Sequence, residues 1–270
     1  MSNAQIKLVP GPQSPVPKKP SNAQLKLVRK LSRKKFRSEL KLFVAEGLRL
    51  CEEVPPAQIE FGFFTREFLS DERAANLIER LKNFAPLEEI SSSTLEKFSD
   101  TQTPQGILLV VRQKISSLAD VATKKIIAVL DGVQDPGNVG TILRTAAAFD
   151  CGVILLDGSA EIFNPKVIRS SMGAIFYLPV AVTSCEKFLS AMSSREILAA
   201  AVDELAEIYF RHDFMKKPVA IVFGSESTGV SKKILDVARK IFVPMVGHAE
   251  SLNVATSAAI ILSEAVRQSQ

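Results

Sequence analysis

The segment DPGNVGTILRTAAAFD holds one side chain that could bind an anion, Arg144. Pro136 and Gly137 should turn the chain into a helix that starts near Asn138. Arg144 faces away from the apolar side of this helix, and Gly137 and Gly140 should leave a clear approach to its guanidinium. Such a planar group in an open groove suits a phosphate. A surface arginine paired with a neighbouring carboxylate is the other interpretation of the same pattern.

The segment VAIVFGSESTGVS places a carboxylate, Glu226, directly after an apolar run that ends at Gly224. Gly229 should turn the chain again, and Ser231 should cap the next helix. Ligands of parallel α/β sheets bind beyond the carboxyl ends of the strands. Glu226 is therefore a candidate for the functional site.

The stretch IFVPMVGHAESLNVATSAAIILSEAV combines a buried strand, a glycine loop and a thin, alanine-rich helix. Either Ser251 or Asn253 can cap that helix, because a short side chain can accept a hydrogen bond from the N–H groups of its first turn. Free backbone N–H groups at such an edge suit a small polar ligand. The same pattern, however, is common in α/β proteins of many functions.

Six continuous apolar runs lie in the same part of the chain as these three segments. They are IIAVLDGV, GVILLDG, FYLPVAV, EILAAAVD, VAIVFGSE and KIFVPM. Runs that are apolar on both faces and separated by helix-length stretches are typical of a parallel sheet covered by helices. The predicted fold is therefore a doubly wound α/β domain at residues 126–270. Nucleotide-dependent oxidoreductases and methyltransferases both use such domains, but the G-x-G-x-x-G run of the former is missing from the sequence.

A smaller α/β domain is predicted at residues 21–112, after a proline-rich flexible arm at 1–20 and before a linker at 113–125. Its expected helices are 22–37, 46–53, 66–84 and 92–98, and its expected strands are 42–44, 59–65, 87–90 and 106–112.

Positive charge is concentrated at the start of the chain. Residues 1–50 hold 12 Lys and Arg against two Glu, whereas the other 220 residues hold 22 against 27 acidic residues, within a net charge of +5. The segment RKLSRKKFR should attract the phosphates of a nucleic acid. A solvated helix face or an acidic membrane surface is the weaker alternative. The candidate RNA-binding residues are Arg29, Lys30, Arg33, Lys34, Lys35 and Arg37.

Cysteine and histidine usage argues against a disulfide framework and against a metal site. Cys51, Cys151 and Cys185 are odd in number and lie in apolar contexts, which predicts buried free thiols. Two histidines cannot complete a usual zinc site with them. No apolar run has the length of a membrane span or of a signal peptide, so a cytoplasmic protein is expected.

The run PMVGHAESLNVATSAAI resembles the last of three signature motifs of the SpoU-type RNA ribose methyltransferases, the TrmH family within the SPOUT superfamily. DPGNVGTILRTAAAFD resembles the first motif, N-x-G-x-x-x-R-T, and VAIVFGSESTGVS resembles the second. Two positions depart from the family pattern. Ser227 stands where glycine is usual, which predicts a stiffer loop, and Ser257 stands where a small residue such as alanine is expected.

The resemblance implies a C-terminal SPOUT domain with a trefoil knot that holds S-adenosylmethionine, and a homodimer in which Arg144 serves the partner's site. It places Gly224, Val243 and Leu252 at the cofactor, largely through backbone groups. It places five residues at the reaction centre: Asn138, Arg144, Glu226, Ser251 and Asn253. The small N-terminal domain, with VAEGLRL, resembles the RNA-substrate-binding domain that precedes many SpoU catalytic domains and is similar to a ribosomal protein fold.

The expected activity is methyl transfer to a ribose 2′-hydroxyl of a structured RNA, ribosomal rather than transfer RNA. A guanidinium stays protonated in proteins, so Arg144 is expected to hold a phosphate and stabilise the developing alkoxide. The sequence leaves the general base and the modified nucleotide open. The alternative function is an RNA-binding or ribosome-assembly module that has lost transferase activity.

Overall fold

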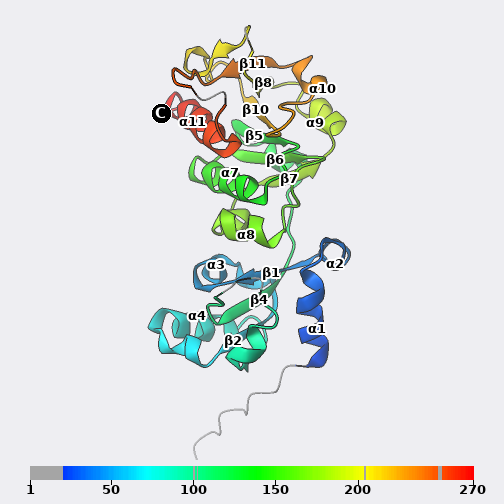
Figure 1. Ribbon diagram of the computed structural model, residues 1–270, viewed down its shortest axis with the longest axis vertical. Helices are drawn as coiled ribbons and strands as arrows, with labels where there is room; N and C mark the ends of the chain where they lie inside the picture. Colours follow the sequence, from blue (N-terminus) through cyan, green and yellow to red (C-terminus); the bar gives the residue numbers. More distant parts are fainter. Residues whose placement is uncertain (1–20, 100, 102, 204, 249–250) are drawn as a thin grey trace, which may run out of the picture.

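The computed structural model describes residues 21–99, 101, 103–203, 205–248 and 251–270. The predicted flexible arm at 1–20 lies outside the described residues. The described residues form two β-sheets, which lie at opposite ends of an elongated molecule (Figure 1).

The smaller sheet has the strand order β1-β4-β2-β3. Strand β4 is antiparallel to β1 and β2, whereas β3 is parallel to β2. Its strands are β1 (Leu42–Glu46), β2 (Ile59–Thr65), β3 (Leu87–Ile90) and β4 (Ile107–Arg112). The helices of this part are α1 (Asn22–Leu31), α2 (Lys34–Leu40), α3 (Leu48–Glu53), α4 (Glu72–Lys82) and α5 (Ser92–Leu95), with 3-10 turns η1 (Pro56–Gln58) and η2 (Glu67–Ser70).

Two of the helices predicted here are divided in the structure. The helix expected at 22–37 breaks between α1 and α2, where the Ser32 hydroxyl donates to the Arg29 carbonyl and Arg33 adopts an extended conformation. A serine hydroxyl that bonds to the backbone competes with helix continuation. The helix expected at 66–84 is interrupted by Asp71, whose carboxylate accepts a hydrogen bond from the Ala74 N–H and so starts α4.

The larger sheet has the order β7-β6-β5-β10-β8-β11-β9, and every neighbouring pair in it is parallel. The six predicted apolar runs form six of its strands, and the two-residue strand β9 was not predicted. The strands are β5 (Ile126–Asp131), β6 (Gly152–Leu156), β7 (Val180–Thr183), β8 (Glu196–Ala200), β9 (Glu207–Ile208), β10 (Val219–Gly224) and β11 (Arg239–Phe242).

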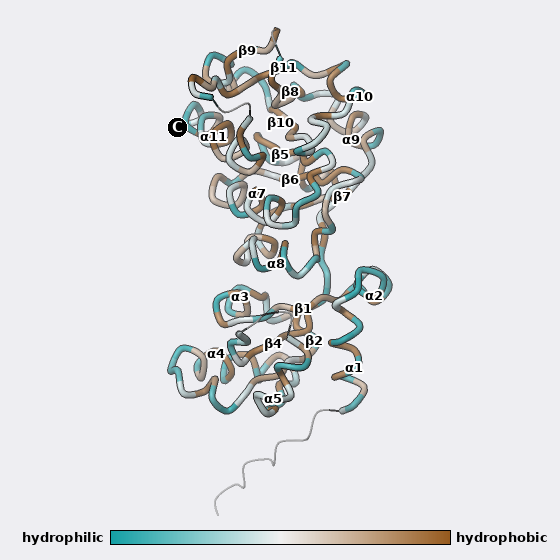
Figure 2. The backbone as a smooth tube through the Cα atoms, viewed as in Figure 1, coloured by the Kyte–Doolittle hydropathy of each residue, from teal (hydrophilic) through white to brown (hydrophobic). Residues whose placement is uncertain are grey.

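Helices cover both faces of this sheet, as the apolar runs predict. They are α6 (Leu118–Val121), α7 (Pro136–Ala148), α8 (Pro165–Ser171), α9 (Cys185–Ala191), α10 (Lys232–Leu235) and α11 (Val254–Arg267), with 3-10 turns η3 (Ala174–Phe176) and η4 (Tyr209–Arg211). Alternate strand residues, such as Leu130 and Val129, belong to separate cores under α7 and α11 and under α6, α9 and α10. In Figure 2 hydrophobic segments run through the strands of both sheets, whereas α2 is hydrophilic. Helix α6 lies inside the predicted linker at 113–125.

The two parts of the molecule share one apolar core. Phe43 of β1 lies with its ring centroid 5.0 Å from that of Phe163 and 6.2 Å from that of Phe176 in the second part. Arg37 forms a bidentate ion pair with Glu161, and its guanidinium also donates to the carbonyls of Leu31 and Ser32. Arg37 is only 3% exposed, so its assignment as an RNA-binding residue was wrong.

None of the helices in the described ranges is both long enough and apolar enough to cross a membrane.

Candidate functional site

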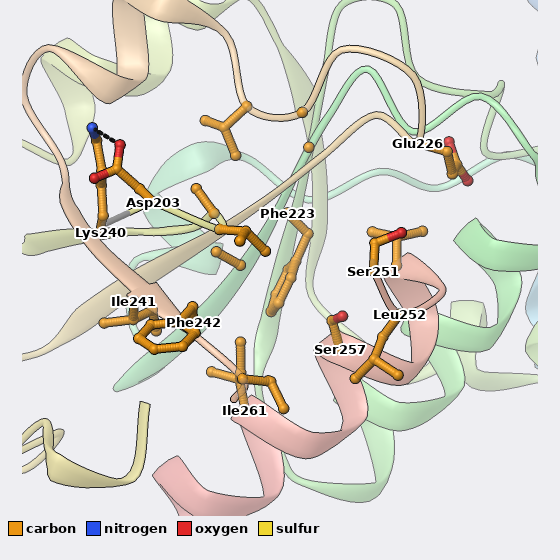
Figure 3. A pocket seen from close by; sticks show the side chains of 18 of the residues that line it. Asp203, Phe223, Glu226, Lys240, Ile241, Phe242, Ser251, Leu252, Ser257 and Ile261 are labelled. Atoms are coloured by element: carbon orange, nitrogen blue, oxygen red, sulfur yellow. Dashed lines mark hydrogen bonds and ion pairs between the residues drawn. The ribbon is translucent and has the colours of Figure 1, made fainter. Parts of the chain in front are cut away.

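A cavity of about 530 Å³ lies beyond the carboxyl ends of β8, β10 and β11, beside the first turn of α11 (Figure 3). Parallel sheets bind their ligands at this edge. Six of the predicted site residues line the cavity: Gly224, Glu226, Val243, Ser251, Leu252 and Asn253. The sequence motifs therefore converge on one concave surface.

Gly224 ends β10 in a place where no side chain fits. A Cβ atom there would lie 2.1 Å from the carbonyl carbon of Gly229 and 2.2 Å from the nitrogen of Val230. The loop closes tightly because Ser225 and Gly229 exchange two backbone hydrogen bonds of 2.9 and 3.1 Å. Ser227, in this loop, is not one of the described residues that adopt a positive φ, so its backbone does not require glycine.

The segment after β11 contributes Val243, Met245 and Leu252 to the lining of the cavity. The N–H groups of Val243, Met245 and Leu252 form no hydrogen bond with any residue that the structure describes. All three residues are half-buried. Backbone donors of this kind require a partner from water or a ligand. They suit a ligand with several polar atoms.

An ion pair that the sequence analysis missed lies at one end of the cavity, opposite Glu226 and Ser251 (Figure 3). Lys240 donates to Asp203 at 2.6 Å. This hydrogen bond, together with one from the Leu205 N–H, lowers the pKa of the Asp203 carboxyl. Asp203 follows strand β8 as Glu226 follows β10, so the same positional signal could have identified it. Between the two ends lie the apolar side chains of Phe223, Phe242 and Ile261.

A chain of hydrogen bonds connects one residue from each of the three motifs at the rim of the cavity. Asn253 Nδ2 donates to Asn138 Oδ1 at 3.0 Å, and Asn138 Nδ2 donates to Glu226 Oε1 at 2.5 Å. Asn253 also caps α11, since its Oδ1 accepts hydrogen bonds from the N–H groups of Ala255 and Thr256. Of the two predicted caps, Asn253 and not Ser251 occupies the N-cap position.

Asn138 is held in place by Asp135. Helix α7 begins at Pro136, two residues before the predicted start, and Asp135 caps it by accepting the Asn138 N–H at 2.9 Å. The other carboxylate oxygen accepts from Lys166 of α8 at 3.0 Å. The hydrogen bond from Lys166, followed by that from the Asn138 N–H, lowers the pKa of Asp135.

Arg144 is exposed on α7 and forms no ion pair with any described carboxylate. It is not among the described residues that line the cavity of its own chain. The expectation that Gly140 clears an approach to Arg144 was wrong. A Cβ at Gly140 would lie 2.4 Å from the Ser170 Cβ and 2.7 Å from the Val167 carbonyl oxygen, so this glycine allows α7 to pack closely on α8.

The remaining predicted residues lie away from the cavity. Arg29, Lys30, Arg33, Lys34 and Lys35 are all exposed on or beside α1 and α2. The thiols of Cys51 and Cys151 are buried and form no disulfide, and burial raises the pKa of both, to about 12 for Cys151. Cys185 is only partly buried. Within the described residues no cluster of His, Cys, Asp and Glu could hold a metal ion.

Comparison with known proteins identifies both parts of the chain. The model of the SpoU rRNA Methylase family matches residues 125–263, and that of the MRM3-like substrate binding domain matches residues 22–109. The 23S rRNA (guanosine(2553)-2′-O)-methyltransferase RlmP of Bacillus subtilis is 30% identical over 89% of this chain and 95% of its own length. Human mitochondrial rRNA methyltransferase 3 is 26% identical over 86% of this chain and 69% of its own.

Solved structures of related enzymes have the same fold. The AdoMet-bound rRNA methyltransferase from Sinorhizobium meliloti is 29% identical and superposes with a TM-score of 0.80, covering 91% of this chain and 95% of its own. The SpoU methyltransferase AviRb from Streptomyces viridochromogenes, in complex with AdoMet, is 25% identical with a TM-score of 0.79, covering 92% and 99%. Because the family match spans residues 125–263 and full-length relatives align over most of both chains, this chain belongs to the SpoU rRNA methylase family.

Proposed function

We propose that this chain transfers a methyl group from S-adenosylmethionine to a ribose 2′-hydroxyl of structured ribosomal RNA. The observation that carries the proposal is the Asn253–Asn138–Glu226 chain of hydrogen bonds at the rim of the 530 Å³ cavity. It joins polar groups from all three signature motifs beside a pocket large enough for a nucleoside. The relatives that act on ribosomal RNA support this substrate class.

The cavity suits S-adenosylmethionine in shape and in chemistry. Phe223, Phe242 and Ile261 offer apolar surface for a base, and the backbone N–H groups of Val243, Met245 and Leu252, which have no partner among the described residues, offer hydrogen bonds. Gly224 allows the loop that lines the cavity at the end of β10 to close on the backbone of Gly229 and Val230. When bound, S-adenosylmethionine supplies a methyl group activated by its positive sulfonium.

The polar residues at the rim would position the RNA and stabilise charge. Glu226 Oε2 has no hydrogen-bond partner among the described residues, so it is free to accept a hydrogen bond from the ribose hydroxyl. Asn138 holds the other oxygen of Glu226 and so orients the carboxylate. Arg144 would bind the adjacent phosphate and stabilise the negative charge that grows on the attacking oxygen. Ser251, at the same end of the cavity as Glu226, would contact the RNA or the cofactor.

We further propose that the chain acts as a homodimer and that its C-terminal segment forms a trefoil knot around the cofactor. Family membership supports both. Arg144 is exposed and lies outside the lining of its own chain's cavity, which favours a role in the partner's site. After β11 the chain returns to α11, which packs against β10, β5 and α7, and this return is compatible with a knot.

The proposed division of labour assigns residues 21–112 to substrate binding, 113–125 to the connection and 126–270 to methyl transfer, in the cytoplasm. The exposed basic residues of α1 and α2 and the match to a substrate-binding domain support this division.

Two measurements test the proposed function. Calorimetry should detect binding of S-adenosylmethionine and S-adenosylhomocysteine but not of NAD. Mass spectrometry of ribosomal RNA from cells with and without the protein should reveal one or more 2′-O-methyl groups that depend on it. Cofactor binding without any dependent methyl group in RNA would favour a module that has lost transferase activity, and binding of NAD alone would contradict the proposal.

A further inference from the structure

A second cavity, of about 830 Å³, lies where the substrate-binding part meets the methyltransferase part. Its lining comes from both. Gly47, Arg49 and Arg73 belong to the N-terminal part, at the starts of α3 and α4, whereas Arg169 and Met172 belong to the end of α8. We call it the interdomain cavity.

The carboxylates that line the interdomain cavity are already engaged. Glu46 accepts hydrogen bonds from the hydroxyls of Ser99 and Thr101. Asp71 caps α4, and the hydroxyl of Ser92 donates to Glu67 at 2.8 Å. Arg73 is also engaged, because it forms an ion pair with Glu52. The hydrogen bonds fix the positions of the three carboxylates and leave their negative charge in place, and none of them forms an ion pair with Arg49 or Arg169 among the described residues.

Two arginines in the same cavity have no such partner. Arg49 is exposed and Arg169 is half-buried, and neither forms an ion pair or a side-chain hydrogen bond with any residue that the structure describes. A partly desolvated guanidinium without an anion is unfavourable, and its planar set of donors matches the oxygens of a phosphate. The two charges approach the cavity from different parts of the chain, so a single anion could contact both parts.

Met172 gives the cavity an apolar element in a strained position. It adopts a left-handed conformation with φ of 49° and is 41% exposed, and Gly173 follows it with φ of 88°. A Cβ at Gly173 would lie 2.6 Å from Cγ of Glu53 in α3, so contact between the two parts requires glycine there. Strained residues of this kind are often found at binding sites. The flexible thioether suits packing against a flat, apolar face such as a nucleobase.

We propose that the interdomain cavity binds the backbone of the RNA substrate, with Arg49 and Arg169 holding one phosphodiester group from two sides and Met172 packing against the adjacent base. This inference rests on the proposed function, because it takes the RNA as the substrate. Since the two parts share one core, the cavity would hold the RNA at a constant distance from the methyl-transfer site and so help to select the nucleotide.

The test measures binding of the full-length protein to an unmodified in vitro transcript of 23S rRNA over a range of NaCl concentrations. Arg49→Ala and Arg169→Ala should each weaken binding roughly 10-fold, as expected for loss of a charge-assisted hydrogen bond. Each should reduce the slope of log K against log salt concentration by about 0.7–0.9, the value for one phosphate contact. Arg169→Lys should retain the slope but recover only part of the affinity.

Lys187→Ala is the matched control. Lys187 is exposed on α9, which covers the opposite face of the larger sheet, and has no described ion-pair partner. Its substitution should leave both affinity and salt slope unchanged. Thermal unfolding checks that the variants fold. If Arg169→Ala does not fold, Arg49→Ala still tests the inference, because Arg49 is exposed and its loss should not affect folding.

Three results distinguish failure of this inference from failure of the proposed function. If both alanine variants bind the transcript with unchanged affinity and slope while the wild type still methylates RNA, the interdomain cavity is not an RNA site. The same conclusion follows if the variants lose binding to polyglutamate but not to RNA, which would indicate an acidic protein partner. If the wild type binds no S-adenosylmethionine and methylates no RNA, the proposed function itself fails.

Discussion

Asn138 and Asn253 are 115 residues apart in the sequence, yet Nδ2 of Asn253 donates to Oδ1 of Asn138 at 3.0 Å. The orientation of both amides follows from one helix cap. Because Oδ1 of Asn253 accepts hydrogen bonds from the first turn of α11, its Nδ2 must face Asn138. Asn138 then accepts with its oxygen and presents its own Nδ2 to Glu226. The N-terminus of α11 thus orients a carboxylate at the end of β10.

Asn253→Asp should distinguish the role of Asn253 as a helix cap from the role of its hydrogen bond to Asn138. Aspartate caps a helix about as well as asparagine, so the free energy of unfolding should change little, whereas Asn253→Ala should lose about 1 kcal/mol. Aspartate cannot donate to Asn138, so kcat should fall roughly 10-fold, the loss of one hydrogen bond. Chemical unfolding and single-turnover kinetics measure the two effects. Full kcat in Asn253→Asp would show that the link to Asn138 has no role in methyl transfer.

Arg144→Ala should reduce turnover without loss of stability. The side chain is exposed and has no described ion-pair partner, so the free energy of unfolding should change by less than about 0.5 kcal/mol. If Arg144 stabilises charge that grows only in the transition state, kcat should fall roughly 10²- to 10³-fold with cofactor affinity unchanged. Arg144→Lys should recover only part of the rate. Thr141→Ala, at an exposed position on the same helix, is the control; equal rates in Arg144→Ala and wild type would remove Arg144 from the mechanism.

Mixed dimers test whether Arg144 serves the partner's site. If it does, a heterodimer of Arg144→Ala and Asn253→Ala subunits contains one site with both residues intact. Such heterodimers should recover up to about half of the wild-type rate, whereas each homodimer stays impaired. No recovery in purified heterodimers would place both residues in the same subunit's site.

Gly224→Ala should impair cofactor binding. The added methyl group would lie 2.1 Å from the Gly229 carbonyl carbon, and relief of that overlap must move the loop that lines the cavity. Overpacking of this kind costs about 1–3 kcal/mol, so S-adenosylmethionine affinity should fall roughly 10-fold or more by calorimetry. Gly247→Ala is the control, because a Cβ at Gly247 meets no atom within 4 Å among the described residues. Similar losses in the two variants would contradict a specific role for Gly224.

The Arg37–Glu161 ion pair should couple the two parts of the chain. The two side chains are 3% and 14% exposed, and removal of one partner leaves a charge in a largely buried place. Arg37→Met should therefore lower the free energy of unfolding by about 3–5 kcal/mol, and Arg37→Met with Glu161→Leu should lower it less. Arg112→Met, which breaks the exposed pair with Glu60, should cost about 1 kcal/mol or less. A cost of the double variant equal to the sum of the costs of Arg37→Met and Glu161→Leu alone would mean that the two charges are not coupled.

Asp135 should make stability depend on pH in the acid range. Its pKa is lowered in the folded protein, so its contribution is complete above the ordinary value of about 3.9 and declines as the pH falls through that value towards the folded pKa. Asp135→Asn should therefore flatten the dependence of the unfolding free energy between about pH 5 and pH 3. Urea unfolding at several pH values measures this. Asp157→Asn, at an exposed position without a described hydrogen-bond partner, should leave the dependence unchanged.

The sequence by itself determined the parallel sheet, because strands such as β5 and β10 are apolar on both faces and only a doubly covered sheet buries them. It also identified six of the residues that line the cavity, and a glycine, a carboxylate or a helix cap at the end of a strand carries a local signal. Gly224 and Asn253 are examples: the backbone conformation and the cap depend on residues close in sequence.

Only the tertiary structure decided which partner each polar group takes. Arg37 belongs to a basic run, and its burial against Glu161 depends on a contact 124 residues away that no local pattern encodes. Gly140 was interpreted from its place in α7, but its role is set by α8, which packs against it. Asp203 and Lys240 meet because β8 and β11 are neighbours in the sheet, and strand order is a property of the assembled fold. Side-chain partners of this kind depend on the distances between elements in the folded chain. The spacing of residues along a single element gives no information about those distances.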